Sequence, residues 1–224
     1  MIMKKFILFL FFMPFAIVGK AQTLTESDLA KIDIKAYDSG FNGRNYNKAA
    51  SVIAKDYPPD KDGNLTRIFI VENINKTKEQ IYIATNNWFI SSFNDANSVI
   101  QLNDKEAGTI IGVGIEPKVE SSWTGSYTDS RILIRVDIKD NRVRIITQIQ
   151  EYDVFFPASN YAPSHRVKWK PIECYPFAET NNIKKKSDSK ALVNSHIACL
   201  GMISRLRDAI IGSSTNTIEA TDNW

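Results

Sequence analysis

The sequence predicts an α+β domain in which two helices pack on one face of a curved antiparallel sheet. Two segments with apolar residues at helical spacing flank a long stretch rich in β-branched residues. That stretch has the alternation of two successive hairpins, each with one apolar face. With a strand before the first helix, the expected order is strand, helix, four strands and helix. The helices should cover the apolar face and leave the other face of the sheet open.

The first 21 of the 224 residues have the pattern of a secretory signal peptide. Residues 1–5 are basic, Phe6–Val18 is an apolar run, and Gly19 and Ala21 are small residues at the cleavage positions. The run is shorter than the roughly 20 residues that a membrane-spanning helix needs; a retained anchor is the alternative. We therefore expect an exported protein, periplasmic or extracellular and soluble after cleavage, with no transmembrane segment once the signal is removed.

Charge and composition exclude some classes of partner. Cleavage would remove Lys4, Lys5 and Lys20, leaving 25 basic and 25 acidic residues. A neutral chain lacks the cationic excess of a nucleic-acid binder, so no nucleic-acid partner is expected. Two Cys and two His, far apart in sequence, predict no metal site and no cofactor. In an oxidising compartment Cys174 and Cys199 could form a disulfide, or Cys199 could be a plain buried thiol.

Residues 22–65 are polar and turn-rich, and we expect them to form an amino-terminal extension to a domain over 66–212. A short helix is expected over 25–35. The Asp60, Asp62 and Asn64 spacing resembles the start of a calcium loop but lacks the bidentate Glu, which favours a solvated turn.

The first strand and helix follow directly. Residues 67–71 predict a buried strand, and Thr77 can cap a helix from Lys78 to about Phe93. Spacings of three, four and seven bring its apolar residues onto one broad face, which is typical of a core and less so of a ligand box. These residues are Ile81, Tyr82, Ala84, Trp88, Phe89 and Phe93.

The first hairpin pairs residues 98–102 with 109–114 across a charged turn. Charges at a hairpin tip are usually solvated, so catalysis there is the weaker interpretation. Gly112-Val113-Gly114 lacks the third glycine and the helix of a dinucleotide-binding loop.

The second hairpin has a predicted register. A two-residue turn at Asp140-Asn141 pairs Lys139 with Arg142 and Ile138 with Val143, and then continues outward. One face carries the pairs Val136–Ile145, Ile134–Thr147 and Ile132–Ile149, and the other carries Asp137–Arg144, Arg135–Ile146, Leu133–Gln148 and Arg131–Gln150. Four arginines, Arg131, Arg135, Arg142 and Arg144, thus line the outer face.

Residues 153–186 are expected to be an irregular insertion, with one short strand over 166–170 and with Tyr161, Trp169 and Tyr175 as aromatic anchors. A helix is expected from about Lys190 to Ile211. Its apolar stripe includes His196, which suits a hydrogen-bonded core histidine better than a catalytic base. Residues 213–224 are a polar tail expected to be disordered.

Part of this pattern resembles a known family. The residues that carry the resemblance are Ala84, Trp88-Phe89, Phe93, Val99-Ile100, Asp104, Gly108, Ile110-Ile111-Gly112 and Gly114. Over roughly 66–150 they look like domain of unknown function 4468, a family of exported Bacteroidota proteins with a TATA-binding-protein-like fold. The resemblance implies that fold, and it supplies no catalytic residue.

The leading functional hypothesis is a non-enzymatic binding or protein-interaction module of the cell envelope. The arginine face, with Leu133 and Ile146 interleaved, suits carboxylate, phosphate or sugar-acid groups. A plain solvated face, on which Asp137 merely pairs with Arg144, is the simpler interpretation.

Two alternatives come from other classes. One is a carrier or sensor that holds a small apolar or anionic ligand between helix and sheet, contacted by Trp88, Trp169 and Tyr175. The other is a hydrolase that uses His165 or His196. The partner would be an envelope protein or a small ligand of unknown identity. DNA binding by analogy with the fold is opposed by the charge and by export.

Overall fold

A computed structural model of the chain describes residues 23–24, 46–93, 99–174 and 182–212. The predicted signal peptide, the helix expected over 25–35, Tyr175 and the carboxy-terminal tail lie outside the described residues.

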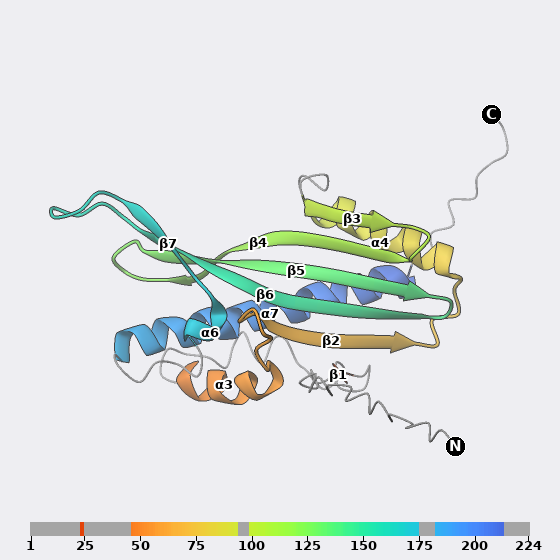
Figure 1. Cartoon of the computed structure of the whole chain (residues 1–224), viewed down its shortest axis with the longest axis horizontal. Helices are drawn as coiled ribbons and strands as arrows, with labels where there is room; N and C mark the ends of the chain where they lie inside the picture. Colours follow the sequence, from red (N-terminus) through yellow and green to blue (C-terminus); the bar gives the residue numbers. More distant parts are fainter. Residues whose placement is uncertain (1–22, 25–45, 94–98, 175–181, 213–224) are drawn as a thin grey trace, which may run out of the picture.

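The described strands form one seven-stranded sheet in the order β1-β2-β6-β5-β4-β3, with β7 paired to β6 (Figure 1). All neighbours are antiparallel except β1 and β2. The strands are β1 (Thr23–Leu24), β2 (Leu65–Glu72), β3 (Ile100–Asp104), β4 (Thr109–Ser121), β5 (Tyr127–Lys139), β6 (Arg142–Phe156) and β7 (His165–Trp169).

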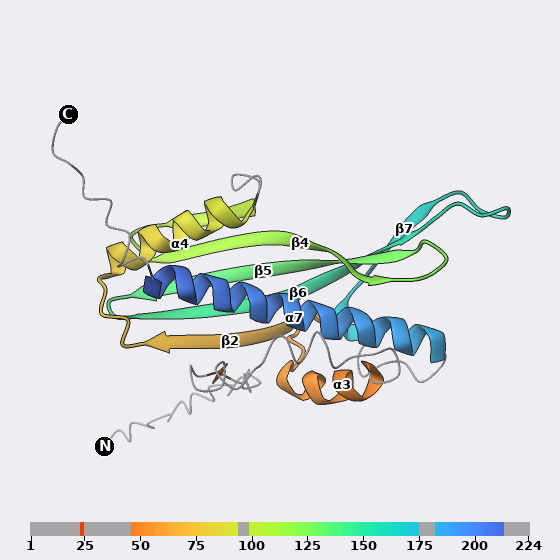
Figure 2. The same ribbon diagram turned by 180° about the vertical axis from the view of Figure 1, so that it is seen from behind.

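Two helices, α4 (Lys78–Ser92) and α7 (Asn182–Gly212), lie on the same face of the sheet, as Figures 1 and 2 show from opposite sides. Helix α3 (Tyr46–Ile53) packs against α7 beside β2. The short helices η1 (Ala54–Asp56) and α6 (Pro171–Cys174) complete the described elements. The predicted fold class, a curved antiparallel sheet with helices on one face, is confirmed.

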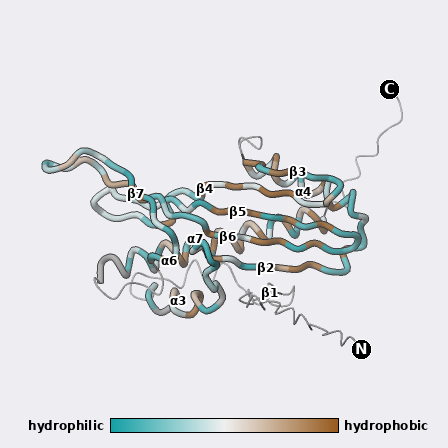
Figure 3. Tube along the Cα trace, in the orientation of Figure 1, coloured by the Kyte–Doolittle hydropathy of each residue, from teal (hydrophilic) through white to brown (hydrophobic). Residues whose placement is uncertain are grey.

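The hydrophobic core lies between the sheet and α4 and α7. Along β5 and β6, buried residues alternate with more exposed ones. Hydrophobic residues concentrate in the central part of the strands, whereas the hairpin that contains β7 is largely hydrophilic (Figure 3). The largest fully buried side chains are Tyr57, Leu65, Phe69, Ile81, Phe89, Ile110, Ile132, Ile134, Ile145, Ile149, Leu200 and Ile203.

Helix α4 begins where the sequence predicts, because Thr77 and Gln80 form a capping box that satisfies two backbone N–H groups. Its aromatic side chains then lie directly on β4, which needs glycine there. A Cβ on Gly112 would come 2.4 Å from Cε1 of Phe89, and one on Gly114 would come 3.0 Å from Cε1 of Phe93. These glycines therefore allow close helix–strand packing.

The register of the second hairpin is as predicted from Lys139–Arg142 out to Ile132–Ile149. Beyond that point the prediction is wrong, because Arg131 pairs with Glu151 and Gln150 is an extra residue in β6. The bulge brings Tyr152 opposite Ser130, and both are buried. A regular ladder would have put Glu151 there, on the helix side of the sheet.

Several boundaries differ from the sequence-based expectation. Ala50, Ile53 and Tyr57, assigned to a polar extension, are buried in the core because α3 packs against α7. Strand β6 continues to Phe156, so the stretch expected to be irregular begins with a strand. Helix α7 starts at Asn182, eight residues earlier than expected. The short strand expected near Trp169 is present as β7.

Candidate binding surface on the open sheet face

The face of the sheet opposite α4 and α7 has charged rows at one end and apolar rows beside them. Cross-strand pairing aligns Glu72, Arg142 and Lys139 in the first row, and Ile70, Arg144, Asp137 and Thr109 in the second. The third row is Ile68, Ile146, Arg135 and Ile111, and the fourth is Thr66, Gln148, Leu133 and Val113.

We call the half-buried apolar residues of these rows the apolar band. They gather in rows two to four, and the band consists of Ile68, Ile70, Ile111, Val113, Leu133 and Ile146. Among the described residues, no helix or strand packs over this face (Figures 1 and 2).

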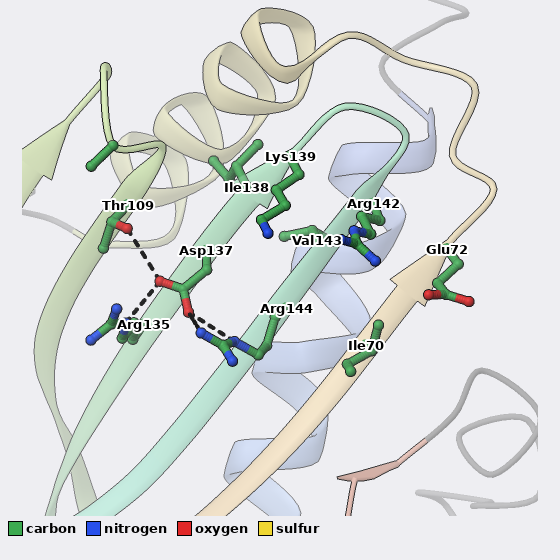
Figure 4. A pocket seen from close by; sticks show the side chains of 11 residues that line it. Ile70, Glu72, Thr109, Arg135, Asp137, Ile138, Lys139, Arg142, Val143 and Arg144 are labelled. Carbon is green, nitrogen blue, oxygen red and sulfur yellow. Dashed lines mark hydrogen bonds and ion pairs between the residues drawn. The ribbon is translucent and has the colours of Figure 1, made fainter.

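A pocket of about 430 Å³, which we call the arginine pocket, lies at the charged end (Figure 4). It is open to solvent and draws its walls from four strands and the turn before β4. Its lining residues are Ile70, Glu72, Ala107, Thr109, Arg135, Asp137, Ile138, Lys139, Arg142, Val143 and Arg144.

Asp137 is the centre of the hydrogen bonds in this pocket. Arg135 Nε donates to its Oδ1 at 2.8 Å, Arg144 Nε donates to its Oδ2 at 2.9 Å, and the Thr109 hydroxyl donates at 3.2 Å. Partial burial alone would raise the pKa of Asp137, but the hydrogen bonds from Arg135 and Arg144 hold the pKa below its usual value. Asp137 therefore stays ionised and fixes two guanidinium groups against the sheet.

The arginine pocket has a net positive charge. Its four cationic side chains, Arg135, Lys139, Arg142 and Arg144, face two carboxylates, Glu72 and Asp137, which leaves an excess of two positive charges. Within the described part of the chain, Lys139 and Arg142 make no hydrogen bond or ion pair through their side chains. These two groups are available to an anionic group of a partner.

The sequence-predicted arginine face separates into two parts. Arg135, Arg142 and Arg144 line the pocket, whereas Arg131 does not. Arg131 lies four residues along β5 from Arg135, opposite Ile115 and Glu151. At roughly 3.3 Å per residue that separation is about 13 Å, too far for one small anion to touch both.

The two predicted loop anchors that the structure describes, Tyr161 and Trp169, do not come together. Tyr161 is 97% exposed in the β6–β7 hairpin, whereas Trp169 is half-buried on β7 and packs against the core. Trp88, which was expected with Trp169 to contact a ligand, belongs to α4 and points into the core. It is 4% exposed, and its ring lies edge-on to Phe89. Both Cys174 and Cys199 are buried, and the structure does not join them in the disulfide that the sequence permits.

His196 lies in the core, as the sequence suggests. It is 2% exposed, and its Nδ1 is 3.0 Å from the Tyr57 hydroxyl and 3.1 Å from Nη1 of Arg67. Arg67 can only donate, so Nδ1 accepts and the ring proton is on Nε2. Burial, aided by the Arg67 charge, lowers the pKa of His196 to about 3. This neutral, enclosed ring is a poor general base.

Sequence reasoning missed Tyr57, Arg67 and Trp123. Arg67 is 3% exposed inside β2 and lies over the Tyr57 ring. The spacing of Ala50, Ile53 and Tyr57 was an available signal for an amphipathic segment. Trp123 is 97% exposed in the β4–β5 hairpin. The one sequence signal for it is that a large aromatic residue stands in a polar turn.

Residues 68–152 match a family model described as a domain of unknown function (DUF4468) with TBP-like fold. The resemblance is confirmed for this segment. Every described lining residue of the arginine pocket, from Ile70 to Arg144, lies within this segment. The family description names no ligand and no reaction.

Two solved structures are also similar. One is a TBP-like protein from Parabacteroides distasonis ATCC 8503, with 20% identity, a TM-score of 0.49, and coverage of 70% of this chain and 97% of that chain. The other is a DUF4468 family protein from Bacteroides ovatus ATCC 8483, with 18% identity, a TM-score of 0.51, and coverage of 76% and 95%. The second supports the fold alone. No curated protein matches the chain.

Two further observations concern the described residues alone. None of their helices combines the length and apolarity needed to cross a bilayer. No group of three or more His, Cys, Asp or Glu side chains among them is arranged to hold a metal ion.

Proposed function

We propose that this domain is a non-enzymatic binding module of the cell envelope, and that its open sheet face holds a protein partner. The observation that supports the proposal is the direct contact between the apolar band and the arginine pocket. Ile70 belongs to both, and Ile146 pairs with Arg135 across β5 and β6. A partner that presents apolar side chains next to a carboxylate would satisfy both parts of the surface.

Apolar side chains on an uncovered sheet face are a typical interaction surface. Burial of the band by a partner would contribute affinity, since apolar area removed from water is worth roughly 25 cal/mol per Å². Lys139 and Arg142 would add orientation and specificity more than affinity, because they remain close to solvent.

Catalysis has less support. His196 is enclosed by Tyr57 and Arg67 rather than by a carboxylate. His165 is exposed, stacks on Phe156 and has its Nδ1 3.3 Å from the Pro163 carbonyl oxygen. Neither arrangement resembles a histidine that is oriented by an acid for proton transfer.

Site-specific photocrosslinking tests the proposed face. We expect benzoylphenylalanine placed at Ile146, in cells that export the protein, to yield a discrete crosslinked species. Arg142→Glu should lower the yield of that species roughly fivefold, because an exposed charge contributes about 1 kcal/mol to binding. Arg131→Glu is the matched control, because it reverses the same charge on the same face outside the pocket. The same species from a crosslinker at Ile83, 53% exposed on α4, would contradict the assignment.

Export has its own test. We expect the protein isolated from its cell to begin at Gln22, because cleavage after Ala21 removes the whole basic and apolar leader. Intact-mass spectrometry of the envelope fraction measures this directly. A chain that still begins at Met1 and stays with the membrane would show that the leader is a retained anchor.

A further inference from the structure

A second cavity, of about 460 Å³, lies away from the arginine pocket, between the far ends of strands β4 to β7 and the early part of α7. Its volume falls in the range of sites that hold small molecules, roughly 300–1,000 Å³. The lining residues are Glu120, Ser122, Trp123, Thr124, Ser126, Thr128, Tyr152, Val154, Phe156, Trp169, Cys174, Ser187, Asp188 and Ala191.

Aromatic rings form much of this wall. Trp123 comes from the β4–β5 hairpin, Tyr152 and Phe156 from β6, and Trp169 from β7. Trp169 pairs with Tyr152 across β6 and β7, so strand pairing fixes the backbone positions of two of these aromatic residues. Trp123 lines the cavity although it is 97% exposed, which places it at the mouth.

The ionisable groups of the cavity wall are acidic. Glu120 and Asp188 are each 8% exposed, and no lysine or arginine is among the lining residues that the structure describes. Lys190 lies outside the lining, with its Nζ 3.7 Å from Oε1 of Glu120. Because Lys190 pairs with Glu120, the acidic excess of these described groups is one charge.

We propose that this cavity binds a small organic cation, an ammonium group carried on an apolar body. Aromatic faces attract such cations through their quadrupole, by about 2 kcal/mol when water is excluded. The acidic excess of the described wall favours a cation and opposes an anion. Of the ligands first considered for the space between helix and sheet, the anionic class is therefore disfavoured here. The proposal does not depend on the open-face partner.

The decisive comparison uses two ligands of the same shape. Isothermal titration of the chain from Gln22 with choline and with 3,3-dimethyl-1-butanol separates charge from size, because the alcohol replaces the charged nitrogen by carbon. We expect choline to bind at least tenfold more tightly than the alcohol. Equal affinities, or no detectable binding of choline, would overturn the proposal.

Variants then locate the site. Asp188→Asn should weaken choline binding at least fivefold and leave binding of the alcohol unchanged, whereas Asp208→Asn, the same change at an exposed position of α7, should have no effect. Trp123→Ala removes an exposed ring, so it tests the mouth even if Asp188→Asn does not fold. Choline binding that survives both Asp188→Asn and Trp123→Ala would place the cation elsewhere and overturn the proposal.

Discussion

Replacing Gly112 with alanine is expected to lower the free energy of unfolding by about 2 kcal/mol, within the range for overpacking a close-packed core. The added Cβ would meet Cε1 of Phe89 at 2.4 Å and Cζ at 3.1 Å. Phe89 is fully buried and stacks with Phe93 at 5.9 Å between ring centroids, so its ring has little space in which to move. Urea unfolding of the variant and the native chain measures the difference.

Gly201→Ala in the middle of α7 is the matched control. Its Cβ would meet only the flexible end of Arg205, at 3.3 Å, and alanine in a helix interior is favoured over glycine by roughly 0.5–1 kcal/mol. The two identical changes should therefore have opposite signs. A Gly112→Ala chain as stable as the native one would mean that α4 does not pack against β4 as described.

The packing of α4 on β4 also explains the residues that carry the family resemblance. Phe89 on α4 packs over Gly112 of β4, and Phe93, at the end of α4, packs over Gly114. Trp88 lies edge-on to both rings. Helical spacing predicts the aromatic face and the hairpin pattern predicts the strand, so sequence alone could place both. The signature residues specify helix–strand packing, which is why they predicted the fold and not a ligand.

The residues on the open face of β5 and β6 could be predicted from the sequence wherever inward and outward side chains alternate regularly. The turn at Asp140-Asn141 fixes which arginines flank Asp137, and the structure has the same pairs. The alternation fails between Ile149 and Tyr152, which are three residues apart and both buried. Only the bulge at Gln150 reconciles them, and the sequence alone does not show on which strand an extra residue falls.

The sequence suggested a ligand between helix and sheet in contact with Trp169, but the rest of the second cavity's wall was not predictable because it comes from segments far apart in sequence. Glu120, Trp169 and Asp188 meet only because β4, β6 and β7 extend past the region covered by β2 and lie over the early part of α7. The strands' twist and the early start of that helix decide this arrangement. Neither follows from local periodicity, since Lys184-Lys185-Lys186 predicts a solvated approach as readily as a first helical turn.

The native chain is expected to lose stability as the pH falls below about 6.5, through the buried His196. Its pKa is about 3 in the folded chain and about 6.5 in the unfolded chain, so between these values only the unfolded state takes up the proton. The stability contributed by the neutral ring is thus fully present above pH 6.5 and is lost as the pH falls toward 3. The slope is about 1.4 kcal/mol per pH unit for this one proton.

His196→Gln isolates that slope from the titration of the carboxylates, which both chains share. At pH 7 the variant should be less stable by about 1–3 kcal/mol, because Tyr57 and Arg67 lose a well-placed acceptor. Between pH 6.5 and pH 5 the gap should close by about 2 kcal/mol, because the variant has no proton to take up there. Urea unfolding at several pH values measures both quantities.

His165→Gln, at an exposed position of β7, is the matched control for removing a histidine. Its stability should fall with pH in parallel with that of the native chain. If the difference in stability between His165→Gln and the native chain also changes by about 2 kcal/mol between pH 6.5 and pH 5, the pH dependence does not come from the core. Parallel stability curves for the native chain and His196→Gln would mean that His196 is protonated about equally in the folded and unfolded states. In that case the ring would not be held away from water beside the Arg67 charge, and the buried group of Tyr57, Arg67 and His196 would have to be arranged differently.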